Sequence, residues 1–171
     1  MPAVEKPKYI LSFDDVRGIL GIGPKELKDA TIALQAYAIP VEGAIERIHE
    51  GLPEKYDEIK AKSTAEPAVT LTRTEKKLLG LTETYATYFG AKLILTNMKS
   101  GALKKITDGK AEAERFPIDF DLLTAEIDGV LADLLARLEV VMPDLGLQVE
   151  ALRFTYLTAI ATLGVDPVTG E

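Results

Sequence analysis

The amino-acid sequence predicts a mostly α-helical bundle of about four to five helices, with a small hairpin or ordered loop and an extended C-terminal arm. Apolar residues recur every three or four positions through most of the chain. Ser12 and Thr72 stand at the starts of such runs as helix-capping residues, and glycine or proline separates the runs. The 171 residues, 47% of them hydrophobic, are enough for one domain with a real core.

We expect three parts along the chain. Residues 1–9 carry two prolines and alternating charges without an apolar period, which predicts a flexible N-terminal arm. Residues 10–142 are expected to form the helical domain. Residues 143–171 follow Pro143 and are expected to form the C-terminal arm.

The first two helices are predicted from caps and breakers. Ser12 precedes two acidic residues and is expected to cap a short helix, which Gly21 and Gly23 end. Pro24 suits the first position of the next helix. A kink or short break is expected at Pro40, which lacks a backbone donor. The apolar positions of this second helix are Leu27, Ala30, Leu34, Tyr37, Val41, Ala44, Ile45 and Ile48.

The middle of the chain predicts one short and one long helix. Residues 51–71 indicate a short, exposed helix followed by a connector. Thr72 and Glu75 have the spacing of a capping box and precede a long central helix that is expected to end near Thr96. Residues 97–116 lose the helical period, which favours a hairpin or ordered loop around its turn residues.

The last third contains the clearest amphipathic pattern. It begins after Pro117 and is limited by Pro143. From residue 145 onward the pattern fits a helix, but its threonines and aromatic residues favour a strand, so both remain open. The predicted core consists of Leu34, Leu78, Tyr85, Phe89, Leu123, Ile127, Leu134 and Leu138.

Charge and composition narrow the function. A net charge of -7 argues against a dedicated nucleic-acid binder, because such proteins need excess Lys and Arg to contact phosphates. The chain has no cysteine, which excludes disulfides and thiolate chemistry. Its apolar runs are shorter than the roughly 18 residues that span a bilayer, and its start lacks a signal-peptide core, so a cytosolic product without membrane contact is expected.

No residue pattern predicts catalysis, a cofactor or a metal site. His49 is the single histidine and has no second ligand or triad partner in the sequence. The glycines before Pro24 lack the remainder of a phosphate-binding loop and are better explained as a helix stop. Four acidic residues suit a helix N-terminus rather than a divalent site, and three aromatic residues at helical spacing suit a core. These are Asp119, Asp121, Glu126 and Asp128, and Tyr85, Tyr88 and Phe89.

The order of elements over about residues 10–142 resembles the head-tail connector (adaptor) proteins of tailed bacteriophages. The likeness rests on a polar segment between two long amphipathic helices rather than on a catalytic signature. Its matching residues are Lys99, Ser100, Asp108, Gly109, Glu112, Glu114, Arg115 and Phe116. The chain departs from short members of that family at residues 51–71 and in its apolar C-terminal extension.

This resemblance implies a non-enzymatic virion protein of the neck, made in the host cytoplasm. It implies a homo-oligomeric ring of about twelve copies beneath the portal protein, which docks the next neck or tail protein. DNA would pass through the channel without specific binding. A tail-completion protein or assembly chaperone, and a small helical ligand-binding or regulatory domain, are the alternatives.

Two sets of contact residues are predicted. The C-terminal arm exposes apolar side chains that must be covered, so it is expected to dock on the portal or an adjacent adaptor. Its docking residues are Leu152, Phe154, Tyr156, Leu157, Ile160 and Leu163. A loop contacting a neighbouring subunit or the channel is expected at Lys104, Lys105, Asp108, Gly109 and Lys110.

Overall fold

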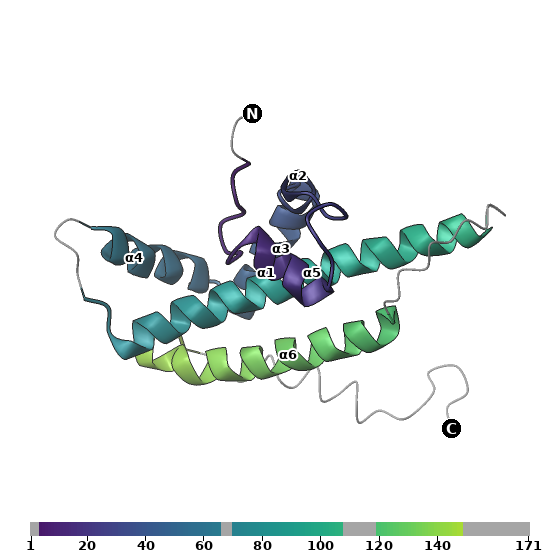
Figure 1. The fold of residues 1–171 in the computed structure, drawn as a ribbon. Helices are drawn as coiled ribbons and strands as arrows, with labels where there is room; N and C mark the ends of the chain where they lie inside the picture. Colours follow the sequence, from purple (N-terminus) through teal and green to yellow (C-terminus); the bar gives the residue numbers. More distant parts are fainter. Residues whose placement is uncertain (1–3, 66–69, 108–118, 149–171) are drawn as a thin grey trace, which may run out of the picture.

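The computed structural model describes residues 4–65, 70–107 and 119–148, and all structural statements concern these residues (Figure 1). Within them all regular secondary structure is helical, and no strand is present. The elements are α1 (Phe13–Leu20), α2 (Asp29–Ile32), α3 (Gln35–Ile48), α4 (Leu52–Thr64), α5 (Arg73–Thr107), α6 (Phe120–Val141) and the short 3-10 helix η1 (Pro143–Leu145). The all-helical fold class is therefore confirmed for the described residues.

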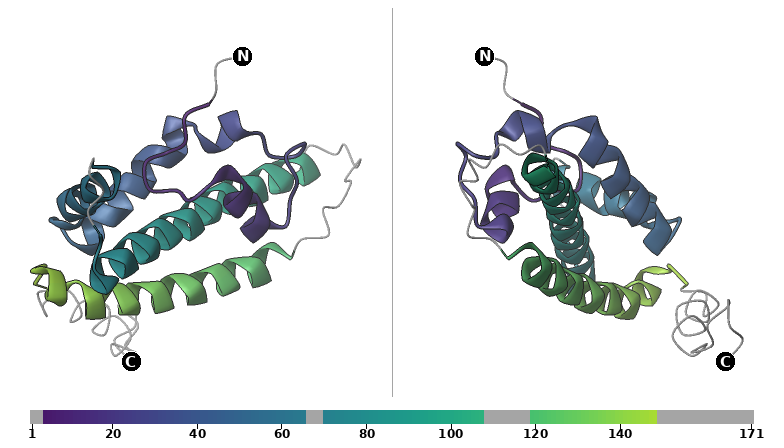
Figure 2. Two further views of the ribbon diagram at one scale, coloured as in Figure 1. Left: turned by 60° about the vertical axis from the view of Figure 1, so that its left-hand side comes forward. Right: turned by 90° about the vertical axis from the view of Figure 1, so that its right-hand side faces the viewer.

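Helix α5 is the axis of the bundle. It packs against α1, α3, α4 and α6, and its longest pairing is with α6. Figure 2 shows α6 running beside α5 in the opposite direction, with α3 and α4 on another side of α5 and α1 on a third. Each of these helices therefore has one face against α5 and another turned outward.

Two of the predicted helix starts, at Ser12 and at Thr72, are confirmed by their caps. Ser12 has an extended backbone, and its hydroxyl accepts the N–H of Asp15 at 3.1 Å. Thr72 and Glu75 form the reciprocal capping box, with bonds of 2.8 and 3.2 Å between each side chain and the other's backbone N–H. The side chain of Asp119 caps α6 by accepting the backbone N–H groups of Asp121 and Leu122. Each cap satisfies donors that would otherwise have no intrahelical partner.

The helix expected from Pro24 to Ile48 is wrong as one element. Residues 24–28 form a turn, α2 is a single turn of helix, and the chain breaks at Leu34, whose ψ of 138° is extended. Pro40 lies inside α3 and not at the break. The break changes which residues face inward: Ile32 is fully buried, whereas Leu34 is 51% exposed and does not belong to the core.

Helix α4 was expected to be exposed, and this is wrong for one of its faces. Leu52, Tyr56 and Ile59 are all at most 2% exposed. Their spacing places them on one side of α4, which packs against α5 and α3. Charged residues surround this stripe and hide it in the sequence; two of them, Lys60 and Lys62, pair with Glu83 and Glu75 of α5.

Helix α5 is longer than expected, because it continues to Thr107 instead of ending near Thr96. Lys104 and Lys105 therefore lie in its last turns and not in an extended piece of a hairpin. Residues 97–107 contain lysine, alanine and leucine, which favour helix once the preceding turns are formed. The predicted turn at Asp108 and Gly109 lies outside the described residues.

Two apolar clusters form the core along the two halves of α5. One lies among α3, α4, the first half of α5 and the end of α6, and the other among α1, α2, the second half of α5 and the start of α6. Of the predicted core residues, Leu78, Ile127, Leu134 and Leu138 are buried. Tyr85, Phe89 and Leu123 are partly buried and pack against the clusters.

Both ends of the described chain attach to the first cluster. Tyr9 belongs to the arm that the sequence predicts to be flexible, but it is 3% exposed, and its ring meets that of Tyr56 edge-on at a centroid distance of 4.9 Å. Lys8 pairs with Asp57 at 2.6 Å. After η1, Leu147 is 8% exposed and belongs to the same cluster.

Candidate functional site

The outward side of α6 carries an uninterrupted apolar and small-residue stripe, which we call the α6 outer face. Its members are Leu122, Ala125, Gly129, Ala132, Ala136 and Val140, and all are exposed. They recur every three or four residues on the side opposite the buried Ile127 and Leu134. The face extends for about 27 Å at the helical rise of about 1.5 Å per residue.

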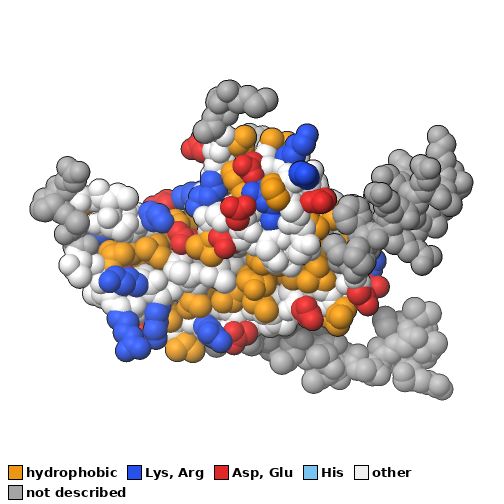
Figure 3. Space-filling model, in the orientation of Figure 1, with side chains coloured by type: hydrophobic (Ala, Val, Ile, Leu, Met, Phe, Trp, Pro, Cys, Tyr) orange, Lys and Arg blue, Asp and Glu red, His pale blue; other side chains and the backbone are white. Residues whose placement is uncertain are grey.

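The α6 outer face is open along its length within the described part of the protein. Leu122 is 59% exposed near one end, and Val140 is 75% exposed near the other. A Cβ atom at Gly129, between them, would meet no other part of the described chain within 4 Å. Figure 3 shows apolar side chains reaching the surface along the α5–α6 side of the molecule, with charged groups among them.

Charges around this face are mainly negative. Between Phe120 and Val141, α6 carries five carboxylates and a single basic residue, Arg137. Asp128 pairs with Lys92 of α5 at 2.5 Å, and Arg137 pairs with Asp133 at 2.8 Å. Helix α6 therefore presents an apolar stripe bordered by an acidic helix surface.

A second, shorter apolar surface lies on α3 and the residue before it. This α3 outer face consists of Leu34, Ala36, Ile39 and Gly43. Leu34 and Ile39 are 51% and 62% exposed. A Cβ atom at Gly43 would again meet nothing within 4 Å. Because α3 and α6 pack on different sides of α5, the two outer faces point in different directions (Figure 2).

Beside α1 lies a shallow depression of about 350 Å³. Its lining residues are Leu11, Asp14, Asp15, Gly18, Ile19, Thr84, Thr87 and Tyr88. Asp14 already pairs with Arg17 at 2.7 Å, and Asp15 accepts the hydroxyl of Ser12 at 2.5 Å. Both carboxylates in the depression therefore have partners within their own chain.

Arg17 is a structural residue that no pattern in the sequence identifies. Its side chain is buried, and its guanidinium contacts Asp14, Asp29 at 2.6 Å and the carbonyl of Leu27 at 3.1 Å. These contacts hold α1 against the turn before α2. Arg17 and Asp29 belong to different elements, so the helical periodicity of the sequence does not predict that they contact one another.

His49 joins two parts of the chain that are distant in sequence. Its Nδ1 accepts the N–H of Gly51 at 3.0 Å, and its Nε2 lies 3.1 Å from the carbonyl of Gln148. The first bond requires an unprotonated Nδ1, which assigns the ring proton to Nε2 as the donor to Gln148. His49 thus connects the α3–α4 turn to the segment after η1.

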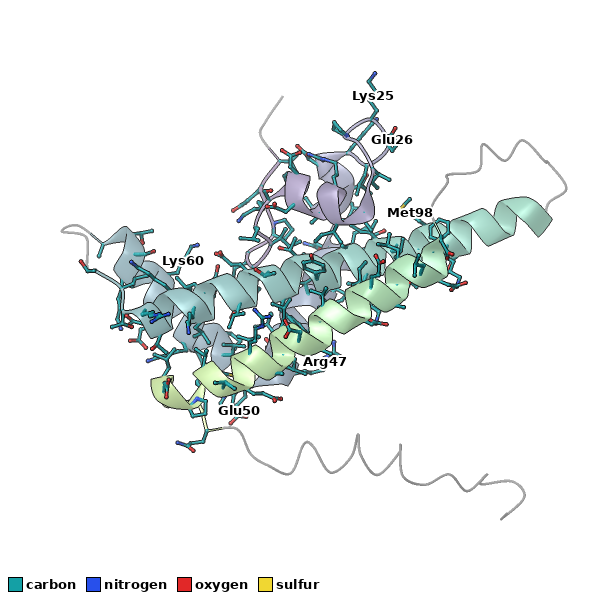
Figure 4. All side chains as sticks on the ribbon, turned by 60° about the horizontal axis from the view of Figure 1, so that its bottom comes forward. Lys25, Glu26, Arg47, Glu50, Lys60 and Met98 are labelled. Atoms are coloured by element: carbon teal, nitrogen blue, oxygen red, sulfur yellow. The ribbon has the colours of Figure 1, made fainter. Side chains whose placement is uncertain are left out.

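A polar network joins α4 to α5 above the buried Tyr56. Glu83 accepts hydrogen bonds from the hydroxyl of Tyr56 at 2.7 Å and from the ammonium of Lys60 at 2.8 Å; Lys60 is labelled in Figure 4. Burial raises the pKa of Glu83, but these two bonds outweigh it and leave the pKa below its usual value. Burial, with the bond to Glu83, raises the pKa of Tyr56 well above its usual range, so Tyr56 stays protonated as the donor.

The acidic and aromatic residues that the sequence offers as possible site residues make structural contacts within the bundle. Asp119 caps α6, and Asp121 pairs with Lys99. The rings of Tyr85 and Phe89 stack at 6.2 Å. Among the described residues, no group of three or more potential ligands could hold a metal ion.

The predicted contact residues are not brought together by the described part of the protein. Lys104 and Lys105 are in α5, but their side chains lie outside the description. The remaining ones, Asp108, Gly109, Lys110, Leu152, Phe154, Tyr156, Leu157, Ile160 and Leu163, lie outside the described residues altogether. The two outer faces were missed, although the Ala/Gly period of α6 is a signal that could have revealed one of them.

Comparison with protein families, curated proteins and solved structures gives no match. None of the helices in the described ranges has the length and apolarity needed to cross a membrane.

Proposed function

We propose that this protein is a structural head-tail adaptor of a tailed phage: a ring subunit that sits beneath the portal, extends the DNA channel and docks the next neck or tail component. The observation that carries the proposal is the pair of outer faces on α3 and α6. A ring whose subunits meet head to tail needs two different surfaces on each copy. Exposed leucine, isoleucine and valine side chains on two sides of one small bundle fit that need.

The charge of the chain fits a conduit for DNA. A net charge of -7 disfavours tight contact with phosphates, so DNA could slide past such a ring. In this proposal the protein acts in the virion neck without catalysis or a cofactor. The part of the C-terminal arm (residues 143–171) that follows Gln148, with the docking residues named from the sequence, binds the portal or an adjacent copy, while the segment around Lys104 and Lys110 faces a neighbour or the channel.

Electron microscopy and native mass spectrometry of the purified chain, alone and with the portal of the same phage, test the proposal. We expect a closed ring with a central channel that binds the portal end on. Reversal of Lys104 and Lys105 to Glu is expected to impair particle assembly or DNA ejection. A chain that remains monomeric with and without portal would refute the adaptor function.

The depression beside α1 favours the main alternative, a small helical ligand-binding or regulatory domain. This alternative predicts a discrete small oligomer and a ligand that shields Tyr88 and Thr84 from solvent when it binds. A tail-completion protein or assembly chaperone would use the same outer faces but would be absent from, or differently placed in, the mature neck.

A further inference from the structure

We infer that the α3 outer face of one copy packs against the α6 outer face of the next, so that these two helices form the lateral contact of the assembly. The inference rests on the proposed ring, but not on the identity of the partner above or below it. It assigns the occupant of each face as a second copy of this chain.

The two faces have complementary relief. The α6 outer face has Leu122 and Val140 towards its ends and only Ala and Gly between them, which makes a shallow trough. On the α3 outer face the large Ile39 stands between the small Ala36 and Gly43, and Leu34 lies before Ala36 at the start of the face. Helices pack by placing the ridges of one into the grooves of the other. Ile39 fits the middle of the trough, where Gly129 leaves most room.

Charge argues against the competing arrangement, in which α6 pairs with α6 of another copy. That pairing would bring together two helix surfaces with five carboxylates and one arginine each, and Glu126 and Asp133 border the stripe itself. Like charges placed opposite one another disfavour an interface. Helix α3 itself carries Glu42, Glu46 and Arg47, all exposed, so its contact with α6 brings fewer like charges together than a contact of α6 with α6, and the turn before α2 adds two basic residues. Lys25 and Lys28 are exposed there, and Figure 4 shows Lys25 projecting from the turn before α2.

The placement of the faces decides the kind of assembly. Because they lie on different sides of α5, a copy that binds through its α3 face keeps its α6 face open for another copy. Such head-to-tail contacts continue until the rotation between copies closes a ring. A contact between two identical faces would stop at a dimer.

Three glycines provide a matched test of the contact. Gly43 and Gly129 lie on the two outer faces, whereas Gly80 lies on α5 outside both, and a Cβ atom at any of them would meet nothing within 4 Å. Arginine favours helix more than glycine does, so each Gly→Arg variant should fold, which circular dichroism checks. By native mass spectrometry we expect Gly43→Arg and Gly129→Arg to be monomeric and Gly80→Arg to assemble like the wild type.

These outcomes separate the inference from the proposed function. If the wild type forms rings on the portal and Gly43→Arg or Gly129→Arg still assembles normally, the lateral contact is wrong and the adaptor function stands. If the wild type forms no ring under any condition, the function itself fails.

Cysteine crosslinking identifies which face meets which, since the chain has no cysteine of its own. Ile39→Cys chains mixed with Gly129→Cys chains should give a covalent mixed dimer on oxidation, whereas each variant alone should not crosslink. Gly80→Cys replaces Gly129→Cys as the control. Efficient crosslinking of Gly129→Cys with itself, or no mixed dimer where rings form, would overturn the pairing of α3 with α6.

Discussion

The hydroxyl of Thr87 in α5 accepts the backbone N–H of Leu11 at 3.0 Å, which ties the chain entering α1 to the central helix. The same hydroxyl donates to the carbonyl of Glu83 at 2.7 Å, so both its hydrogen-bonding roles are used. Thr82, one and a half turns earlier and equally buried, has no hydrogen-bond partner for its hydroxyl among the described residues. The two threonines are therefore equally buried in the same helix, but only the hydroxyl of Thr87 makes hydrogen bonds that stabilise the fold.

This difference predicts opposite effects of the same substitution. Thr87→Val should lower the free energy of unfolding by about 1 to 2 kcal/mol, because it leaves the N–H of Leu11 without its partner. Thr82→Val removes a buried hydroxyl that has no described partner and should leave the stability unchanged or raise it. Urea unfolding of both variants measures the difference. Equal destabilisation by the two would contradict the assigned bonds.

The register of α6 is tested by Ile127 and Leu122. Ile127 is 1% exposed, whereas Leu122 is 59% exposed on the same helix. Ile127→Ala should cost about 2 to 5 kcal/mol because it leaves a cavity in the core. Leu122→Ala should have little effect on the unfolding of the monomer, although it weakens assembly in our proposal. An unchanged thermal midpoint for Ile127→Ala would show that α6 is rotated about its axis, with Ile127 outside the core.

Acid should destabilise the contact between α4 and α5. The pKa of Glu58 is lowered to about 2 by Lys55 and Lys62, and that of Glu75 is lowered by the N–H of Thr72 and by Lys62. Since these carboxyls bind protons more weakly when folded than when unfolded, protonation favours unfolding. Their contribution is complete above the unfolded pKa of about 4.5 and is lost as the pH falls from there towards 2.

Thermal midpoints measured by circular dichroism between pH 7 and pH 2 check this prediction. Lys62 contacts Glu58 at 2.7 Å and Glu75 at 3.1 Å, so Lys62→Met should reduce the loss of stability in acid. The groups are partly exposed, so salt should reduce the effect as well. The idea fails if Lys62→Met unfolds with the same pH dependence as the wild type.

Two truncations locate the boundary between bundle and arm. Ending the chain after Gln148 keeps Leu147 in the core and the Gln148 carbonyl beside His49, so the helix content and thermal midpoint should persist while portal binding is lost. Ending it after Asp144 exposes the space filled by Leu147 and should cost about 1.5 to 3 kcal/mol. Loss of folding on removing residues 149–171 alone would show that they complete the subunit core and would refute the docking arm.

The sequence by itself determined the starts of α1, α5 and α6 and the buried side of α6. Ser12, Thr72 and Asp119 act within three residues of their own positions, so their chemistry needs no distant partner. The helical spacing of the apolar residues around Ile127 likewise identifies the buried stripe of α6 from local sequence alone.

Only the tertiary structure decided which other groups are buried. Tyr9 is buried because Tyr56 of α4 covers it, and Arg17 is buried because Asp29 folds back onto it. The direction of Leu34 depends on where the chain breaks to place Ile32 in the core. Likewise, α6 has a stripe of large apolar residues and one of small residues. Packing against α5 covers the larger side chains, because their burial removes more apolar area from water, and leaves the Ala/Gly side exposed.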